Sequence, residues 1–120
     1  MNRDQARLVP QVDSVTIAVD TAVSGVIDQT KGSLAGILFP STFDGTVITF
    51  TGCDTSDGTF VAVIGSDGNA LSYTVAASKL LALTDAQQKQ FMGIPYLKVI
   101  PSTTQTTTAS ILKVLKRAFS

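Results

Sequence analysis

The residues that could do chemistry are few in this 120-residue chain, which has no His, no Glu and one cysteine, Cys53. A Ser, Thr or Cys nucleophile ordinarily needs a neighbouring base, most often a histidine, to remove its proton. The six lysines fall mostly where exposed strand or helix faces are expected. We therefore expect no catalytic residues and predict that the protein is not an enzyme.

Two aspartates, Asp54 and Asp57, lie close together in the segment CDTSDGT and are the best candidates for a metal site. Carboxylate oxygens in a loop suit calcium, but the segment lacks the spacing of an EF-hand and its bidentate Glu. Zinc would need clustered Cys and His, and neither common phosphate-binding glycine pattern occurs. We interpret both aspartates as turn residues, with calcium as the alternative, and expect no metal and no cofactor.

Cys53 cannot form an internal disulfide because it has no partner in the chain. We interpret it as a small, partly buried residue at the end of a strand. A reactive thiol or a bridge to another molecule is the alternative.

Binding residues are also sparse. An aromatic platform for carbohydrate would have to use Tyr73 and Tyr96, because Trp is absent and the six Phe residues are expected in the core. Lys113, Lys116 and Arg117 form a small basic end. We interpret it as a solvated edge, and the alternative is docking onto an acidic partner surface.

Nine basic residues balance nine aspartates, so the formal net charge is zero. Nucleic acid is not expected as a partner, because contacts with phosphates need a basic surplus. Membrane is not expected either, since no apolar run approaches the roughly 18 residues of a span. The first residues lack the apolar core of a signal peptide, which predicts synthesis in the cytoplasm. Zero charge gives little repulsion between copies and suits an assembly.

Alternating apolar residues predict a series of short strands, separated by polar turns. Asp-Gly occurs three times, at 44–45, 57–58 and 67–68, each time between two of these strands. Turns of this kind at such short spacing favour antiparallel pairing over β-α-β units. The predicted strands cover residues 14–19, 22–27, 34–39, 46–51, 59–64, 71–76 and 96–100.

One short helix is expected over 84–92, where Thr84 can cap the first turn and Gly93 and Pro95 follow the last. The uncharged run 102–108 is interpreted as a hairpin loop or strand edge. Residues 109–119 fit either a strand or a helix by spacing alone. We favour a strand through Lys116, as the closing partner of strand 96–100.

These elements predict an all-β fold, an antiparallel β-sandwich or jelly roll of about eight strands with one short helix. We expect one domain over residues 14–120. Residues 1–13 are polar and are expected to form an extended N-terminal arm. Such an arm either frays or lies on a neighbouring subunit.

About 80 residues of the chain resemble small virion structural proteins of tailed bacteriophages. The pieces are common turn and strand sequences, and it is their order that resembles this group. They are FPSTFDGT at 39–46 and ITF at 48–50, then DGTFV at 57–61, SDG at 66–68, YTVAAS at 73–78, FMGIPYLKV at 91–99 and a closing strand over 111–116.

The resemblance implies a β-sandwich that decorates or cements a capsid and is located in the virion. It implies the major capsid protein as a partner and a homo-oligomer, a trimer or dimer, as the assembly state. It supplies no catalytic residues. The alternatives are a tail, neck-adaptor or fibre-base protein of the virion, or a carbohydrate-binding module.

Overall fold

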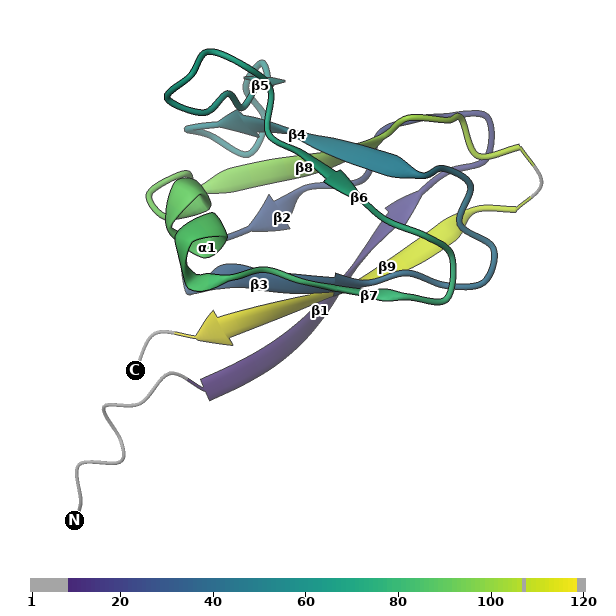
Figure 1. Ribbon diagram of the computed structural model, residues 1–120, viewed down its shortest axis with the longest axis horizontal. Coiled ribbons are helices and arrows are strands. Elements are labelled where there is room, and N and C mark those ends of the chain that lie inside the picture. The colour runs from purple at the N-terminus through teal and green to yellow at the C-terminus, as the bar shows by residue number, and fades with distance from the viewer. Residues whose placement is uncertain (1–8, 107, 119–120) are drawn as a thin grey trace.

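Two antiparallel sheets lie face to face in the computed structural model, which describes residues 9–106 and 108–118 (Figure 1). The first sheet has the strand order β1-β9-β3-β7, and the second has the order β2-β8-β4-β5 with β6 also paired to β4. The all-β antiparallel sandwich expected from the sequence is confirmed. The strands of the first sheet are β1 (Val9–Ile17), β9 (Ser110–Ala118), β3 (Gly32–Leu38) and β7 (Leu80–Ala82); those of the second are β2 (Ile27–Asp28), β8 (Tyr96–Pro101), β4 (Val47–Cys53), β5 (Val61–Ala62) and β6 (Ser72–Thr74).

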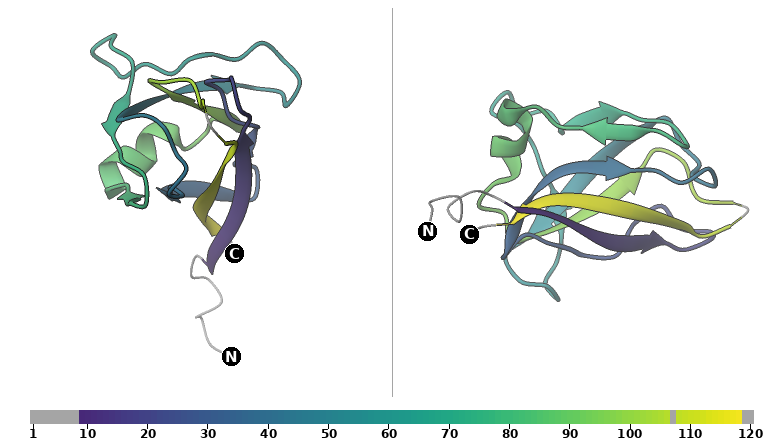
Figure 2. Two further views of the ribbon diagram at one scale, coloured as in Figure 1. Left: turned by 90° about the vertical axis from the view of Figure 1, so that its right-hand side faces the viewer. Right: turned by 90° about the horizontal axis from the view of Figure 1, so that it is seen from below.

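The core lies between the two sheets, because each long strand turns every second side chain inward. In β4 the buried positions include Ile48 and Phe50, and in β9 they include Leu112 and Val114. Burying each such side chain contributes about 1.5–3 kcal/mol, so the core supplies most of the driving force for folding. The two layers are seen from two further sides in Figure 2.

The predicted helix is confirmed as α1 (Asp85–Phe91), which covers one end of the space between the sheets (Figure 1). The Thr84 hydroxyl accepts a hydrogen bond from the Gln87 backbone N–H, and the Gln87 side chain accepts one from the Thr84 N–H. This capping box satisfies two backbone donors that the first turn would otherwise leave unpaired. At the other end Phe91 is fully buried, with its ring centroid 4.7 Å from that of Phe50.

Segment 22–27 forms no continuous strand, although its sequence predicted one. Only Ile27 belongs to β2, because the segment crosses from the first sheet to the second. Gly25 donates its N–H to the Thr16 carbonyl in β1, while the Ser24 N–H donates to the Val99 carbonyl in β8. A chain that bonds to two different sheets within two residues cannot continue a single ladder. Conversely, the short strand β7 was not predicted.

Strand β9 confirms the expected strand over the last segment, but its expected partner was wrong. It lies between β1 and β3 in the first sheet, whereas both sides of β8 are taken by β2 and β4. The pairing with β1 also moves the start of the domain. Residues 9–13, expected in the arm, pair with β9 from Val9↔Ala118 to Asp13↔Val114. The rest of the expected arm, residues 1–8, lies outside the described residues.

A buried glutamine joins three loops at the end of the sandwich opposite α1. The Gln105 side chain donates to the Asp44 carbonyl at 2.8 Å and accepts from the Asp44 N–H at 3.0 Å. It also accepts from the Ser110 hydroxyl at 2.7 Å. Its backbone bonds to Asp20 and Thr21. The described part of the uncharged run around Gln105 therefore lies between β8 in the second sheet and β9 in the first, and the run is not a hairpin within one sheet.

We expect Gly36→Ala to destabilise the protein. A Cβ at this position in β3 would lie 2.6 Å from the Leu81 carbonyl oxygen in β7, and that backbone atom cannot move without disturbing the strand pair. The expected loss is about 1–3 kcal/mol in the free energy of unfolding, measured by urea denaturation. Gly25→Ala is the matched control, because nothing lies within 4 Å of its added methyl group. Equal unfolding midpoints for the two variants would contradict this account.

Candidate interaction surface

The two faces of β9 separate the residues that the sequence grouped into one basic end. Lys116 is 5% exposed and shares the inner face with Leu112 and Val114. Lys113 and Arg117 are exposed on the outer face. The predicted basic cluster of three residues is therefore wrong, because alternation along a strand places position 116 opposite positions 113 and 117.

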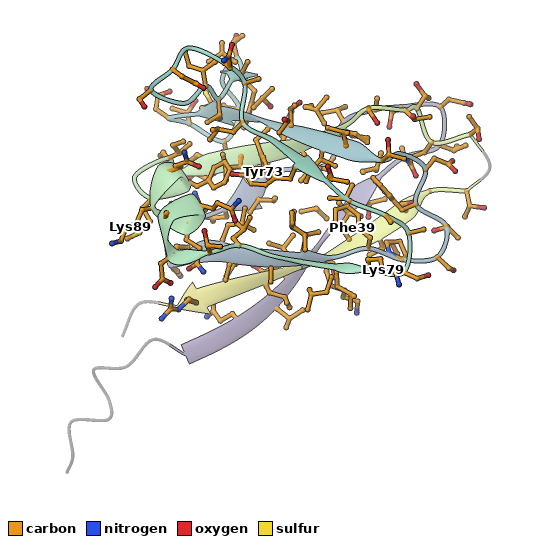
Figure 3. The ribbon with its side chains drawn as sticks, viewed as in Figure 1. Phe39, Tyr73, Lys79 and Lys89 are labelled. Atoms are coloured by element: carbon orange, nitrogen blue, oxygen red, sulfur yellow. The ribbon has the colours of Figure 1, made fainter. Side chains whose placement is uncertain are left out.

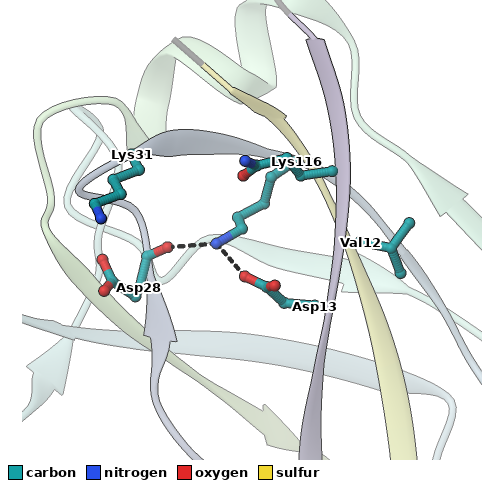
Figure 4. Close-up of a pocket in the computed structure, with 6 residues that line it drawn as sticks. Val12, Asp13, Asp28, Lys31 and Lys116 are labelled. Atoms are coloured by element: carbon teal, nitrogen blue, oxygen red, sulfur yellow. Dashed lines mark hydrogen bonds and ion pairs between the residues drawn. The ribbon is translucent and has the colours of Figure 1, made fainter.

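The Lys116 ammonium joins the two sheets at their open side (Figure 4). Its Nζ pairs with the Asp13 carboxylate in β1 and donates a hydrogen bond of 2.8 Å to the Asp28 carbonyl in β2. A buried ammonium needs such partners, since an unpaired charge of this kind costs several kcal/mol. Lys116 is thus a structural residue of the sandwich.

The outer face of the first sheet carries large apolar side chains although it is exposed to solvent. Leu38 in β3 pairs with Leu80 in β7, and on its other side with Lys113 in β9. The exposed fractions are 43% for Leu38, 54% for Leu80, 53% for Ile111 and 59% for Val12. We call these four residues the apolar face.

A shallow hollow of about 250 Å³ lies at one end of the apolar face, lined in part by Leu38, Ile111 and Lys113. The charges on and beside the apolar face are mostly basic, and the exposed Asp85 carboxylate of α1 lies 3.9 Å from Arg117. Lys113 and Arg117 project from its central strand, and Lys79 precedes Leu80 and points outward (Figure 3). Within the described strands of this sheet the one acidic residue is Asp13, and its carboxylate pairs with Lys116. Exposed apolar patches with a polar rim are typical of interaction sites. The arrangement suits a partner surface that is apolar and carries carboxylates.

The candidate metal residues lie in an exposed turn after β4. Among the residues that the structure describes, no group of three or more His, Cys, Asp or Glu side chains is placed to bind a metal. Cys53 is partly buried at the end of β4, as expected, and its thiol contacts the Asp54 carboxylate at 3.5 Å. The turn is tight, because a Cβ on Gly58 would lie 2.6 Å from the Cys53 sulfur. The turn interpretation of Asp54 and Asp57 fits this geometry.

The two tyrosines do not form a shared platform. Tyr73 is 9% exposed and its ring packs edge-on against Phe50, between the sheets (Figure 3). Burial raises the pKa of its hydroxyl above 10.0. Tyr96 is partly buried, and the inward positions of its strand, β8, are those of Leu97 and Val99. A carbohydrate-binding surface built on both rings is therefore absent from the described residues.

Gln29 is a polar residue that sequence reasoning missed. It is 7% exposed, and its side-chain amide donates to the Phe91 and Ile94 carbonyls at 2.9 and 2.8 Å. Its side-chain oxygen accepts from the Leu34 N–H at 2.7 Å. These bonds fasten the end of α1 to β3. Little in the sequence indicated that Gln29 would be buried, because a Gln in a polar loop is ordinarily exposed.

Comparison with known proteins finds no protein-family model that matches the chain and no match among curated proteins. No helix within the described residues is both long and apolar enough to cross a membrane.

We expect Asp13→Asn to lower stability by on the order of 1–3 kcal/mol, because it leaves the buried Lys116 ammonium without a carboxylate while Asp13 itself is 56% exposed. Asp85→Asn is the matched control. Asp85 lies 3.9 Å from the exposed Arg117, and exposed pairs of this kind contribute little. Urea denaturation at neutral pH measures both. Equal losses in the two variants would show that Lys116 does not depend on Asp13.

We expect the stability of the protein to depend on pH through the carboxyl of Asp28. Hydrogen bonds from the Thr30 hydroxyl and N–H lower the pKa of Asp28 below its usual 3.8, and the Lys116 and Lys31 charges lower it further. A lowered pKa stabilises the fold above pH 3.8, and this contribution is lost as the pH falls through the folded-state pKa. Thr30→Val should raise the Asp28 pKa and flatten this loss, as measured by unfolding between about pH 5 and pH 2. Thr16→Val, exposed on β1, should leave the profile unchanged.

Proposed function

We propose that this protein is a structural component of a bacteriophage virion that decorates or cements the capsid by docking its apolar face onto the major capsid protein. The observation that carries the proposal is the exposed apolar side of the first sheet, with 43–59% of each of its four large side chains open to solvent. The ordered series of turn and strand sequences that resembles virion proteins supplies the biological setting.

The charges favour a different protein over a second copy as the occupant of this face. Two copies docked face to face would bring Lys113 and Arg117 of each into one interface without a carboxylate from the same strands. Like charges placed together cost several kcal/mol and select against the wrong partner. A capsid surface with apolar residues and carboxylates would match both features.

The alternatives to a capsid protein are another structural protein of the virion and a carbohydrate-binding module. A tail, neck-adaptor or fibre-base protein would use the same face but occur in a few copies per particle, whereas a capsid protein occurs in hundreds. Counting copies in purified particles separates these two positions. A carbohydrate-binding module is disfavoured, because Tyr73 is engaged in the core.

We expect Ile111→Asp to weaken binding to particles that lack the protein by at least about tenfold, since it places a carboxylate in the apolar face, opposite a partner surface that itself carries carboxylates. Val61→Asp is the matched control, because Val61 is 63% exposed but lies in β5 of the second sheet. Cosedimentation with the particles measures both. Equal binding by the two variants would remove the apolar face from the interface.

The cement role has its own test. Particles assembled without the protein should release their DNA at a lower temperature or after a milder osmotic shock than complete particles. Addition of the purified protein should restore resistance, and addition of Ile111→Asp should not. Equal resistance with and without the protein would overturn the cement role.

A further inference from the structure

Among the described strands, β1 forms one edge of the first sheet, and its backbone groups alternate between β9 and the open side. The Thr16 carbonyl accepts a hydrogen bond of 3.1 Å from Gly25, which lies away from β9. Backbone groups of alternate residues face the same side in an antiparallel pair. The N–H and C=O groups of Ser14 and Val12 therefore face the open side. Pro10 belongs to the same set, as expected for a proline at an edge, where a missing N–H breaks no ladder.

The open side of β1 is a groove. Two hollows of about 400 and 190 Å³ share Asp13 from β1 and Asp28 from β2. Strand β2 is the edge of the second sheet and pairs with β8 alone among the described strands. The edges of both sheets thus border one groove, and Lys116 crosses it at the level of Asp13 and Asp28 (Figure 4). In that view Val12 points away from Lys116, across β1.

We propose that residues 1–8 of a second copy of this chain lie in this groove as an added strand on β1. Edge strands with unpaired backbone groups accept extended segments in this way. Eight extended residues span about 27 Å, and the open part of β1 from Gln11 to Val15 is about 17 Å long, so the segment is long enough to cover it.

The sequence favours placement of residues 1–8 on β1 of a second copy over placement on β1 of their own chain. To lie on its own β1, the chain would have to reverse direction between residues 6 and 9, immediately before the strand. That segment is Ala-Arg-Leu-Val and contains no Gly, Asn, Asp or Pro, which are the residues that form tight turns. A segment that continues away from β1 instead reaches a neighbouring molecule, and each copy can then give one segment and receive one.

The charges of the segment and the groove are compatible. Arg3 and Arg7 fall on the same side of an extended chain, because they are four residues apart. Asp28 at the groove offers a carboxylate that is hydrogen-bonded by Thr30 and, among the described residues, by no cation side chain. Asp4 falls on the opposite side from the arginines, and Lys31 also borders the groove. This self-association uses the edge of β1, so it does not rest on the proposed docking of the apolar face.

The test compares the full chain with a variant lacking residues 1–8 and with Ser14→Pro. Proline at position 14 removes an N–H that faces the groove and leaves the bonds to β9 intact. Ser14→Ala is the matched control. We expect the full chain and Ser14→Ala to self-associate in analytical ultracentrifugation at micromolar concentration. The deletion variant and Ser14→Pro should be monomers with thermal midpoints close to that of the full chain.

A labelled peptide of residues 1–10 provides a second measurement, which tests binding to the groove directly and does not depend on self-association of the chain. It should bind the deletion variant, with a change in fluorescence anisotropy, and should bind at least about tenfold more weakly when Ser14→Pro is added, since the central strand-to-strand hydrogen bond is lost. A monomeric full chain at these concentrations would overturn the proposal. So would self-association that survives the deletion, or a peptide that does not bind.

Discussion

The structure depends on the alternation of side chains along β9, the strand that pairs with both β1 and β3. Leu112 and Val114 are fully buried between the sheets, so the strand cannot slip by one residue without exposing both and burying Lys113. That constraint orients the rest of the strand. It turns Lys116 inward to the groove and leaves Ile111 in the apolar face. Both surfaces proposed for binding therefore follow from the register of one strand.

Polar side chains at the margins of the sandwich determine how the two sheets sit on each other. Apolar cores tolerate many arrangements of their side chains. A buried polar group, by contrast, destabilises the fold by its full desolvation penalty unless it meets specific hydrogen-bond partners. Gln105 meets this requirement at one end, and Gln29 meets it beside α1. At the open side Ser24 donates its hydroxyl to the Gly25 carbonyl and accepts from the Val99 N–H, and Lys116 joins Asp13 to Asp28. These contacts give a small domain a single arrangement of its sheets.

The two proposed surfaces adjoin each other at Val12 and can act together. The apolar face is the outer side of the first sheet, and the groove lies along one edge of that sheet and opens toward the second. A protein joined to its neighbours by exchanged segments would present several apolar faces at once. Several weak contacts made together bind far more tightly than one. Zero net charge suits such an assembly, because copies at high local concentration repel one another little.

Local patterns in the sequence determined the fold class, the Asp-Gly turns at 57–58 and 67–68, the capped helix at Thr84 and the inward positions of most strands. Each of these depends on residues a few positions apart, where backbone geometry and alternation act directly. Tertiary structure alone decided that β9 pairs with β1 and β3, that residues 9–13 belong to the sheet, and that segment 22–27 crosses between sheets. It also separated Lys116 from Lys113 and Arg117. These outcomes depend on which distant strands share a sheet, and the spacing of residues within one strand carries no information about its partner.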